Sequence, residues 1–214
     1  MRIATVVLTA PRPKPTLART LRSLEAAGRS RGDGPTGGRC VRVYRDRESS
    51  GHFRAYMAAL HHAVQRDAAA DAYFLVEDDV VVCRGLYAYL QRTLWPGPDE
   101  KLALCSPYCP QAYRQKTRGW SDAQSGRGLS LAGSQAWVFS AWSARAVLAE
   151  VAPLCTVHNA DREIGAWAKA TGRQVWYHTP SLGQHVGIRN SSLGDDTLNS
   201  LRIAGDFPGE EACP

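Results

Sequence analysis

An acidic triplet inside an apolar run constrains this chain more than any other stretch. The run Tyr73–Val82 has four apolar residues, then Glu77, Asp78 and Asp79, then three valines. Its β-branched and aromatic flanks predict a strand buried in a sheet that is packed on both faces, with the acids where this strand leaves the core. Carboxylates in apolar surroundings are strongly disfavoured unless a positive charge meets them, and hard divalent cations bind carboxylate oxygens. The run therefore predicts a metal site; the alternative is a strand that ends in a solvated acidic turn.

The composition indicates a single globular domain with a small anionic ligand. The chain has 214 residues, of which 44% are hydrophobic, and this is enough to bury a sizeable core. The formal net charge is +6, and the basic residues are scattered along the sequence. Scattered positive charge fits nucleotide phosphates at least as well as nucleic acid, and the sequence shows no RNA-binding signature or basic helix-turn-helix pattern. We therefore expect no nucleic-acid partner.

The N-terminus and the cysteines predict a soluble, cytoplasmic protein without a membrane span. The chain starts directly with a short apolar strand pattern over 2–9, and no apolar run approaches the ~18–20 residues that cross a bilayer. The six cysteines show no Cys-x-x-Cys pair and no histidine at zinc-finger spacing. We expect reduced thiols; the alternative is that Cys105 and Cys109 pair in an oxidising compartment.

The order of the elements predicts a mostly parallel sheet flanked by helices. Apolar periodicity places strands over 3–8, 41–44 and the acidic run, with helices over 16–27 and 53–64 between them. Units of this kind join parallel strands by right-handed crossovers, and ligands bind beyond the carboxyl ends of the strands. The segments at those ends are 9–12, 45–46 and 77–79. Hence we expect these three segments to line one crevice.

The second half of the chain adds further strands and helices and a long polar loop. We expect helices over 85–94, 143–151 and 161–171 and strands over 102–106, 135–139 and 175–178. The stretch 119–133 is polar and glycine-rich, which is typical of a lid or a disordered loop. We expect one α/β domain over 1–194, followed by a weakly patterned tail over 195–214.

Several stretches resemble the GT-A glycosyltransferases. The triplet of acids resembles the Asp-x-Asp type motif of that fold, and the run Leu-Thr-Ala-Pro-Arg-Pro over 8–13 resembles its nucleotide-binding opening. Asp46 is similar to the acidic residue that faces the donor base. The run Pro-Ser-Leu-Gly-Gln-His-Val-Gly-Ile-Arg-Asn-Ser-Ser-Leu-Gly over 180–194 resembles a segment of the type IV branching N-acetylglucosaminyltransferases. A looser resemblance to the GT-A fold as a whole, which includes the family 2 glycosyltransferases, spans 3–194.

This resemblance implies a Rossmann-like GT-A fold and an activity. Residues 1–83 form the implied nucleotide-sugar-binding half, and 84–194 the acceptor-side half. The implied activity is metal-dependent transfer of a sugar from a nucleoside diphosphate donor, a UDP-sugar, to a hydroxyl acceptor, with inversion at the anomeric carbon. Because the chain is short and shows no anchor or stem, an N-glycan acceptor is not carried over.

The resemblance assigns the metal and the donor to the acidic edge. Asp79 is the expected ligand of Mn²⁺ or Mg²⁺, and His185 is similar to a late histidine that reaches the metal in many GT-A enzymes. The alternative for His185 is a core histidine bonded to backbone. Arginines that could meet the leaving diphosphate, or remain solvated, are Arg12, Arg45, Arg54 and Arg189. The expected donor-binding residues are Thr9, Ala10, Pro11, Arg12, Asp46, Arg54, Glu77 and Asp78.

The acceptor side is expected to carry the general base. Asp161 resembles the acidic residue that starts the acceptor-side helix of inverting GT-A enzymes; it could instead cap that helix, and Glu163 is the alternative base. The expected acceptor-side residues are Trp120, Ser134 and Gln135, whereas Trp137 and His178 are expected to be structural. Four histidines have no acidic residue at a sequence spacing that would indicate a pair, and we assign them no role: His52, His61, His62 and His158.

Two other classes of protein share parts of this pattern. A nucleotidyltransferase has a similar sheet and acidic metal site, but it usually carries a glycine-rich phosphate loop after its first strand, where this chain has Ala-Pro-Arg-Pro-Lys-Pro over 10–15. A non-catalytic nucleotide-sugar-binding module would keep the crevice without needing Asp161.

Overall fold

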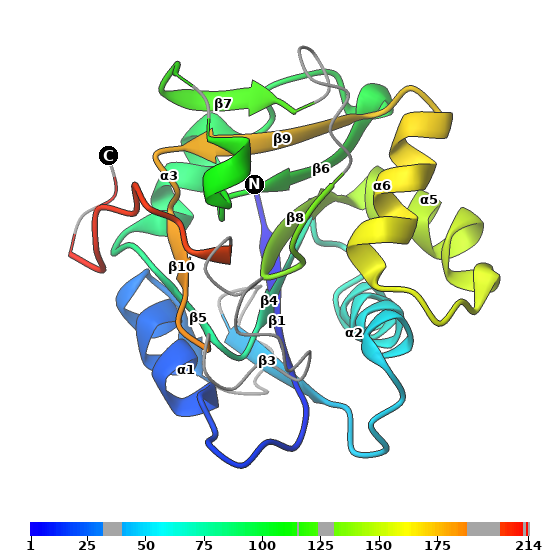
Figure 1. Cartoon of the computed structure of the whole chain (residues 1–214), viewed down its shortest axis with the longest axis horizontal. Coiled ribbons are helices and arrows are strands. Elements are labelled where there is room, and N and C mark those ends of the chain that lie inside the picture. The colour runs from blue at the N-terminus through cyan, green and yellow to red at the C-terminus, as the bar shows by residue number, and fades with distance from the viewer. Residues whose placement is uncertain (32–39, 115, 124–130, 188–201, 212, 214) are drawn as a thin grey trace.

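The computed structural model of the chain describes residues 1–31, 40–114, 116–123, 131–187, 202–211 and 213 (Figure 1). The strands are β1 (Ile3–Thr9), β2 (Ser30–Arg31), β3 (Cys40–Arg45), β4 (Ala72–Glu77), β5 (Val80–Val82), β6 (Leu102–Ser106), β7 (Gly119–Asp122), β8 (Ala136–Ser140), β9 (Gln174–Thr179) and β10 (Gly183–His185). The helices are α1 (Leu17–Ala26), α2 (His52–Arg66), α3 (Leu86–Thr93), α5 (Ala141–Glu150) and α6 (Ala160–Ala170). Short 3-10 turns lie at Asp99–Lys101, Gln111–Tyr113 and Ala152–Leu154.

A mixed sheet of eight strands forms the centre of the molecule, in the order β2-β3-β1-β4-β8-β6-β9-β7. The strands from β2 to β4 in this order are parallel to one another, and so are β6 and β9. β8 runs antiparallel to β4 and β6, and β7 runs antiparallel to β9 at the edge. β5 and β10 form a separate antiparallel pair. The predicted α/β class and single central sheet are confirmed.

Alternating side chains of the central strands build a core on each face of the sheet. In β1, Ala4, Val6 and Leu8 belong to one buried cluster, whereas Ile3 and Val7 belong to the other. Because successive residues of a strand point to opposite faces, a strand that is apolar throughout must be covered on both. Residues of α2, α5 and α6 complete the first cluster and those of α1 and α3 the second, and α1 and α2 lie on opposite sides of the sheet in Figure 1.

Most of the predicted elements are confirmed, with ends that shift by one or a few residues. Apart from the two-residue strand β2, the order β1-α1-β3-α2-β4 is the one expected for parallel strands joined by crossovers. α1 ends just before Gly28, whose φ of +109° lies in a region that favours glycine. Trp137 is buried in the core, and the ring of His178 bonds with the Tyr89 hydroxyl and the Pro180 carbonyl, so both residues are structural as expected.

The prediction of a single strand over 73–82 is wrong. The chain turns at Asp78 and Asp79, so that β4 ends and β5 pairs with β10 outside the central sheet. Asp78 holds this turn, because its N–H donates to the Leu8 carbonyl (3.0 Å) and its carbonyl accepts from Thr20 Oγ1 (2.8 Å). Periodicity does not reveal such a turn, since the residues on both sides of it are apolar.

Parts of two predicted segments lie outside the described residues. The polar stretch 119–133 begins with the edge strand β7 rather than with a loop, and its residues 124–130 are not described. The run over 180–194 is described as far as Gly187, so Arg189 lies outside the described residues. Among the described residues, none of the helices combines the length and the hydropathy needed to cross a membrane.

Candidate active site

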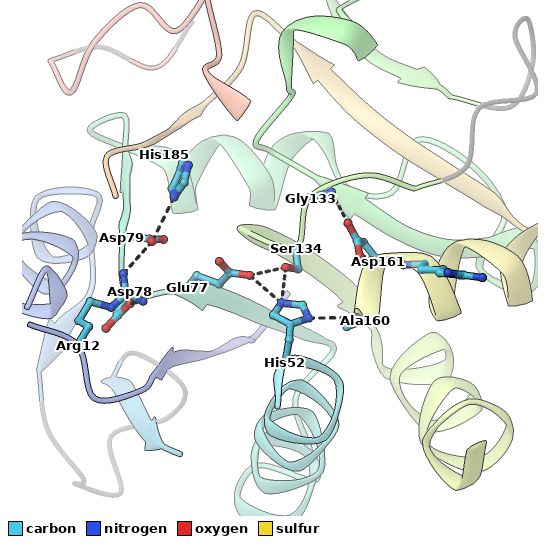
Figure 2. Close-up of polar contacts among 11 residues, drawn as sticks. Arg12, His52, Glu77, Asp78, Asp79, Gly133, Ser134, Ala160, Asp161 and His185 are labelled. Atoms are coloured by element: carbon cyan, nitrogen blue, oxygen red, sulfur yellow. Dashed lines mark hydrogen bonds and ion pairs between the residues drawn. The ribbon is translucent and has the colours of Figure 1, made fainter. Parts of the chain in front are cut away.

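Arg12 supplies positive charge to the two aspartates of the turn. Asp78 and Asp79 are only 1% and 3% exposed. The guanidinium of Arg12, from the loop after β1, forms ion pairs with Asp78 Oδ1 and, at 2.9 Å, with Asp79 Oδ2 (Figure 2). The sequence pattern predicts a cation at this turn, and the guanidinium of Arg12 neutralises part of the negative charge there.

Asp78 faces the end of β1. Its Oδ2 accepts a hydrogen bond from the hydroxyl of Thr9. Burial raises the pKa of Asp78 to about 6, although this hydrogen bond and the charge of Arg12 favour the ionised form. The carboxylate of Asp78 is therefore less stable than that of an exposed aspartate, and it depends on the two partners from the β1 end.

Asp79 lies between Arg12 and His185. The pairing of β5 with β10 sets His185 opposite Val80, so that the ring reaches the preceding turn and Nε2 lies 3.1 Å from Asp79 Oδ2. Burial disfavours the ionised carboxylate, but the hydrogen bond and charge of His185, together with those of Arg12, outweigh burial and lower the pKa of Asp79. A Cβ at Gly187 would lie 2.3 Å from Oδ2 of the same carboxylate, so any larger residue there would displace it.

Asp79 and His185 present neighbouring atoms that a metal ion could use. Asp79 Oδ1 is buried and has no hydrogen-bond partner, and His185 Nε2 faces Oδ2 of the same carboxylate at 3.1 Å. A carboxylate oxygen and an imidazole nitrogen suit Mn²⁺, which can take its other ligands from phosphate and water. Within the described part of the chain, no group of three or more His, Cys, Asp or Glu side chains could hold a metal ion. The pair fits a cation shared with a substrate rather than one held by protein ligands alone.

A pocket of about 240 Å³ opens beside the turn. The predicted crevice segments line it together, and the lining residues are Thr9, Ala10, Pro11, Arg12, Pro15, Leu17, Arg45, Asp46, Arg47 and Asp78. Its three arginines outnumber its two acids, so the lining attracts an anion. The structure thus brings together six of the eight residues predicted to bind a donor, all except Arg54 and Glu77.

Asp46 shapes this pocket through the loop that follows β3. It is buried, and its carboxylate accepts hydrogen bonds from the Ser50 N–H (2.9 Å) and the Ser50 hydroxyl (3.1 Å). Its own N–H donates to the Thr9 carbonyl (2.9 Å). Asp46 therefore joins two walls of the pocket, and part of its hydrogen-bonding capacity is used within its own turn.

Glu77 belongs to a second polar network on the other side of the turn (Figure 2). Its Oε1 accepts a hydrogen bond from the Ser134 hydroxyl and lies 3.2 Å from His52 Nε2, and the same nitrogen lies 2.8 Å from Ser134 Oγ. On the other side of the ring, the Ala160 N–H donates to His52 Nδ1 (3.1 Å). Because Nδ1 accepts this bond, the neutral ring carries its proton on Nε2, where it faces Glu77 and Ser134.

His52 is the site residue that the sequence analysis missed. It is the first residue of α2, and its ring links the end of β4 with the start of α6. Its position in the chain could have indicated a place in the site. The residue that opens a helix after a parallel strand lies at the carboxyl edge of the sheet, where ligands bind. The sequence separation between His52 and its acidic partner gave no indication of their contact, since Glu77 is 25 residues away.

Asp161 lies at the start of α6, next to the second network. Its Oδ2 accepts from the Gly133 N–H (3.0 Å), and its Oδ1 accepts from the Arg162 N–H (2.9 Å). Gly133 directly precedes Ser134, so two consecutive residues join Asp161 to Glu77. The Asp161 side chain remains partly exposed, which a base that meets a substrate requires.

The other predicted site residues occupy three different places. Gln135 is buried behind Ser134, and its carbonyl accepts from the Glu77 N–H (2.9 Å). Arg54 lines a second pocket, of about 280 Å³, between the start of α2 and residues 156–158. Trp120 lies on the edge strand β7, four strands from β4, where its indole N–H donates to Thr93 (3.1 Å). The structure brings Gln135 next to the acids but does not bring Trp120 there.

Solved structures share the fold of this chain, although no family model and no curated protein sequence matches it. A197 from STIV is 12% identical with a TM-score of 0.51, over 86% of this chain and 85% of that one. A Drosophila β-1,4-galactosyltransferase 7, in complex with manganese, UDP-Gal and xylobiose, is 10% identical with a TM-score of 0.52, over 87% of this chain and 71% of that one. TarS from S. aureus is 12% identical with a TM-score of 0.53, over 93% of this chain but only 41% of that one.

These likenesses span 86–93% of this chain. The chain has the GT-A fold. The sequence resemblance to that fold is therefore confirmed, while the finer resemblance to the type IV branching enzymes stays a prediction. At identities of 10–12% the likeness establishes the fold alone, so the chemistry of this GT-A protein has to be argued from its own residues.

Proposed function

We propose that this GT-A protein is a glycosyltransferase that moves a sugar from a nucleoside diphosphate donor to a hydroxyl acceptor. The observation that carries the proposal is the arginine-lined pocket, which shares Arg12 and Asp78 with the acidic turn. A nucleoside diphosphate in this pocket would have its phosphates at Arg12 and its sugar toward Glu77. Asp161 then lies on the far side of Glu77, where an acceptor can approach (Figure 2).

The donor is proposed to be a UDP-sugar. The Drosophila galactosyltransferase of similar fold was solved with UDP-Gal, which supports a uridine nucleotide here. Thr9, Ala10 and Pro11 offer one pocket wall to the nucleoside, and the three arginines of the pocket offer charge to the diphosphate. That charge matters most as the bond to the sugar breaks, because the leaving diphosphate then gains negative charge.

Asp79 and His185 are proposed to hold Mn²⁺ or Mg²⁺ when the donor is bound. Asp79 Oδ1 has no hydrogen-bond partner, and His185 Nε2 faces this carboxylate, so a cation between them would replace their hydrogen bond. A divalent cation at this place would neutralise part of the charge on the leaving diphosphate. Arg12 binds the other oxygen of Asp79, so its guanidinium would then divide its hydrogen bonds between the acids and the phosphates.

Asp161 is proposed to be the general base. The acceptor hydroxyl attacks the anomeric carbon, its proton passes to Asp161, and the nucleoside diphosphate leaves with the electron pair of the broken bond. Attack from the face opposite the nucleotide inverts the configuration. The position of Asp161 in the first turn of α6 supports this role, because the helix dipole favours a carboxylate there.

Release of nucleoside diphosphate tests this function. The protein is mixed with UDP-sugars and Mn²⁺, and release of UDP is followed with and without a panel of hydroxyl acceptors. We expect slow donor hydrolysis that Asp79→Ala abolishes and that Asp99→Ala, a change of an exposed acid, leaves intact. Absence of nucleotide binding in the presence and absence of Mn²⁺ would contradict both the donor and the metal.

The base is tested separately with Asp161→Asn. We expect this variant to lose transfer by about 10²-fold or more, while its affinity for the donor changes little. A variant that loses donor binding and stability together would instead assign a structural role to Asp161.

A non-catalytic nucleotide-sugar-binding module is the second candidate. Asp161 favours it, because both carboxylate oxygens already accept backbone N–H groups, as they would in a purely structural residue. This candidate predicts donor binding that depends on Asp79 without any hydrolysis or transfer above the rate in buffer. The UDP-release assay therefore separates the two functions.

A further inference from the structure

The sulfur atoms of Cys83 and Cys213 lie 2.6 Å apart, although 130 residues separate them in the sequence. Non-bonded carbon atoms, which are smaller than sulfur, have their optimum separation at about 3.5–4.0 Å, and a disulfide bond is ~2.0 Å long. The two thiols are therefore closer than separate thiols pack. Both are free in this structure, as are Cys105 and Cys109, the pair considered from the sequence.

Burial and a backbone hydrogen bond hold Cys83 in place. It directly follows β5, is fully buried, and its N–H donates to the Leu182 carbonyl (3.0 Å). The next residue, Arg84, donates its N–H to the Glu210 carbonyl (3.1 Å). This bond fixes the chain near its C-terminal end beside Cys83, and Cys213 packs against the same apolar cluster that contains Cys83.

Other contacts hold the C-terminal segment, residues 202–211 and 213, on the same surface. The side chain of Gln184 in β10 bonds to both the N–H and the carbonyl of Ala204, each at 3.0 Å. Asp206 accepts from the Ser181 N–H (3.1 Å) and lies 3.2 Å from Arg114 Nε. Because these bonds are independent of the sulfurs, the approach of the two thiols follows from the packing of the whole segment.

We propose that Cys83 and Cys213 form a reversible disulfide bond that ties the C-terminal segment to the end of β5. This site is independent of glycosyl transfer. It lies close to the acidic turn, because β5 starts directly after Asp79 and its partner β10 ends with His185. The bond would fasten the segment that covers this strand pair.

The oxidant can be a low-molecular-weight disulfide such as oxidised glutathione. Cys213 is only half-buried, and its hydrogen bond with Cys83 lowers the pKa of its thiol, so its thiolate attacks first and displaces one glutathione thiol. The sulfur of Cys83 then attacks the mixed disulfide at Cys213 and displaces the second. The two protein thiols lose two electrons and two protons, and the oxidant gains them as two thiols.

Peptide mapping tests the bond. The whole chain is incubated with oxidised glutathione, denatured in iodoacetamide without reductant and digested. We expect a cross-linked peptide that contains Cys83 and Cys213 and is two hydrogens lighter than the sum of its parts, with the other four of the six cysteines alkylated. Alkylation of both Cys83 and Cys213, or a link from either one to a different cysteine, would overturn the proposal.

Two variants and a melting experiment test the effect of the bond. In Cys213→Ser we expect no cross-link and an alkylated Cys83, whereas Cys155→Ser, a change of an exposed cysteine, retains the cross-link. Reduction is expected to lower the Tm of the oxidised wild type by about 5–10 °C and to leave that of Cys213→Ser unchanged. Equal Tm values for the oxidised and reduced wild type would contradict a stabilising tie.

Discussion

The acidic turn separates two regions of the site that neutralise their carboxylates in different ways. The charged region consists of Arg12, Asp78, Asp79 and His185; Arg12 forms ion pairs with both aspartates, and His185 Nε2 lies 3.1 Å from Asp79 Oδ2. The hydrogen-bonded region consists of His52, Glu77, Ser134 and Asp161, and its members are joined through a hydroxyl, an imidazole and backbone N–H groups. Consecutive residues of one tripeptide, Glu77 and Asp78, therefore belong to different environments.

The two regions also differ in their exposure to solvent. The side chains of Asp78 and Asp79 are 2% and 5% exposed, whereas those of Glu77 and His52 are 18% and 29% exposed. Charges in a buried region interact strongly and are costly to leave unpaired, while partly exposed groups can be solvated by water. We therefore expect substitutions in the charged region to affect stability more than substitutions in the hydrogen-bonded region.

The largest effect is expected for Arg12→Ala. This change leaves two buried carboxylates without their shared cation, and we expect the free energy of unfolding to fall by about 3–5 kcal/mol in urea denaturation. Arg47→Ala removes an exposed arginine of the same pocket and is the control, with an expected change below about 0.5 kcal/mol. Similar losses in the two variants would show that burial of the acids is not what makes Arg12 important.

The second effect is a pH dependence that belongs to Asp78. Its pKa in the folded protein is about 6, above the ordinary value of 3.8, so the unfolded chain ionises first as the pH rises. The wild type is therefore expected to lose about 2 kcal/mol of stability relative to Asp78→Asn between pH 4 and pH 7 in the absence of metal. The difference between the two proteins in urea denaturation at each pH measures this. A difference that is independent of pH would place Asp78 in an ordinary polar environment.

A smaller effect is expected in the hydrogen-bonded region for His52→Ala. The variant loses the partner of the Ala160 N–H and one partner of Glu77, but both groups can be partly solvated, so we expect a loss of about 1–2 kcal/mol. His61→Ala, on an exposed position of the same helix, is the control. If transfer is measured as well, we expect His52→Ala to lower kcat more than it changes the KM for the donor. A loss as large as that of Arg12→Ala would remove the distinction between the two regions.

The sequence was informative where burial and chain order decide the structure. The largely apolar β1 and β4 are covered on both faces, as their composition predicts, and the parallel order brings Thr9, Asp46 and Asp78 to one pocket. The pairing of His185 with Asp79 was expected only from resemblance to a family, since 106 residues separate the two.

The sequence was uninformative where a single backbone or side-chain contact decides the structure. The turn at Asp78 depends on hydrogen bonds to Leu8 and Thr20, and the pattern of apolar residues in the sequence does not predict these bonds. The charge argument for a metal likewise did not foresee that Arg12 reaches both aspartates. His52 was missed because its partners come from β4, the segment before β8 and the start of α6, which meet only in the folded chain.

Calorimetric titration of UDP into the protein tests the proposed donor site most directly. We predict that UDP binds to the wild type and to Asp99→Ala in the presence of Mn²⁺, and that omission of Mn²⁺ or the change Asp79→Ala weakens binding by about tenfold or more. The arginine-lined pocket and the adjacent pair of Asp79 and His185, whose Nε2 faces the carboxylate, account for that result. Binding of UDP that is equally strong without Mn²⁺ and without Asp79, or no binding at all, would contradict the account.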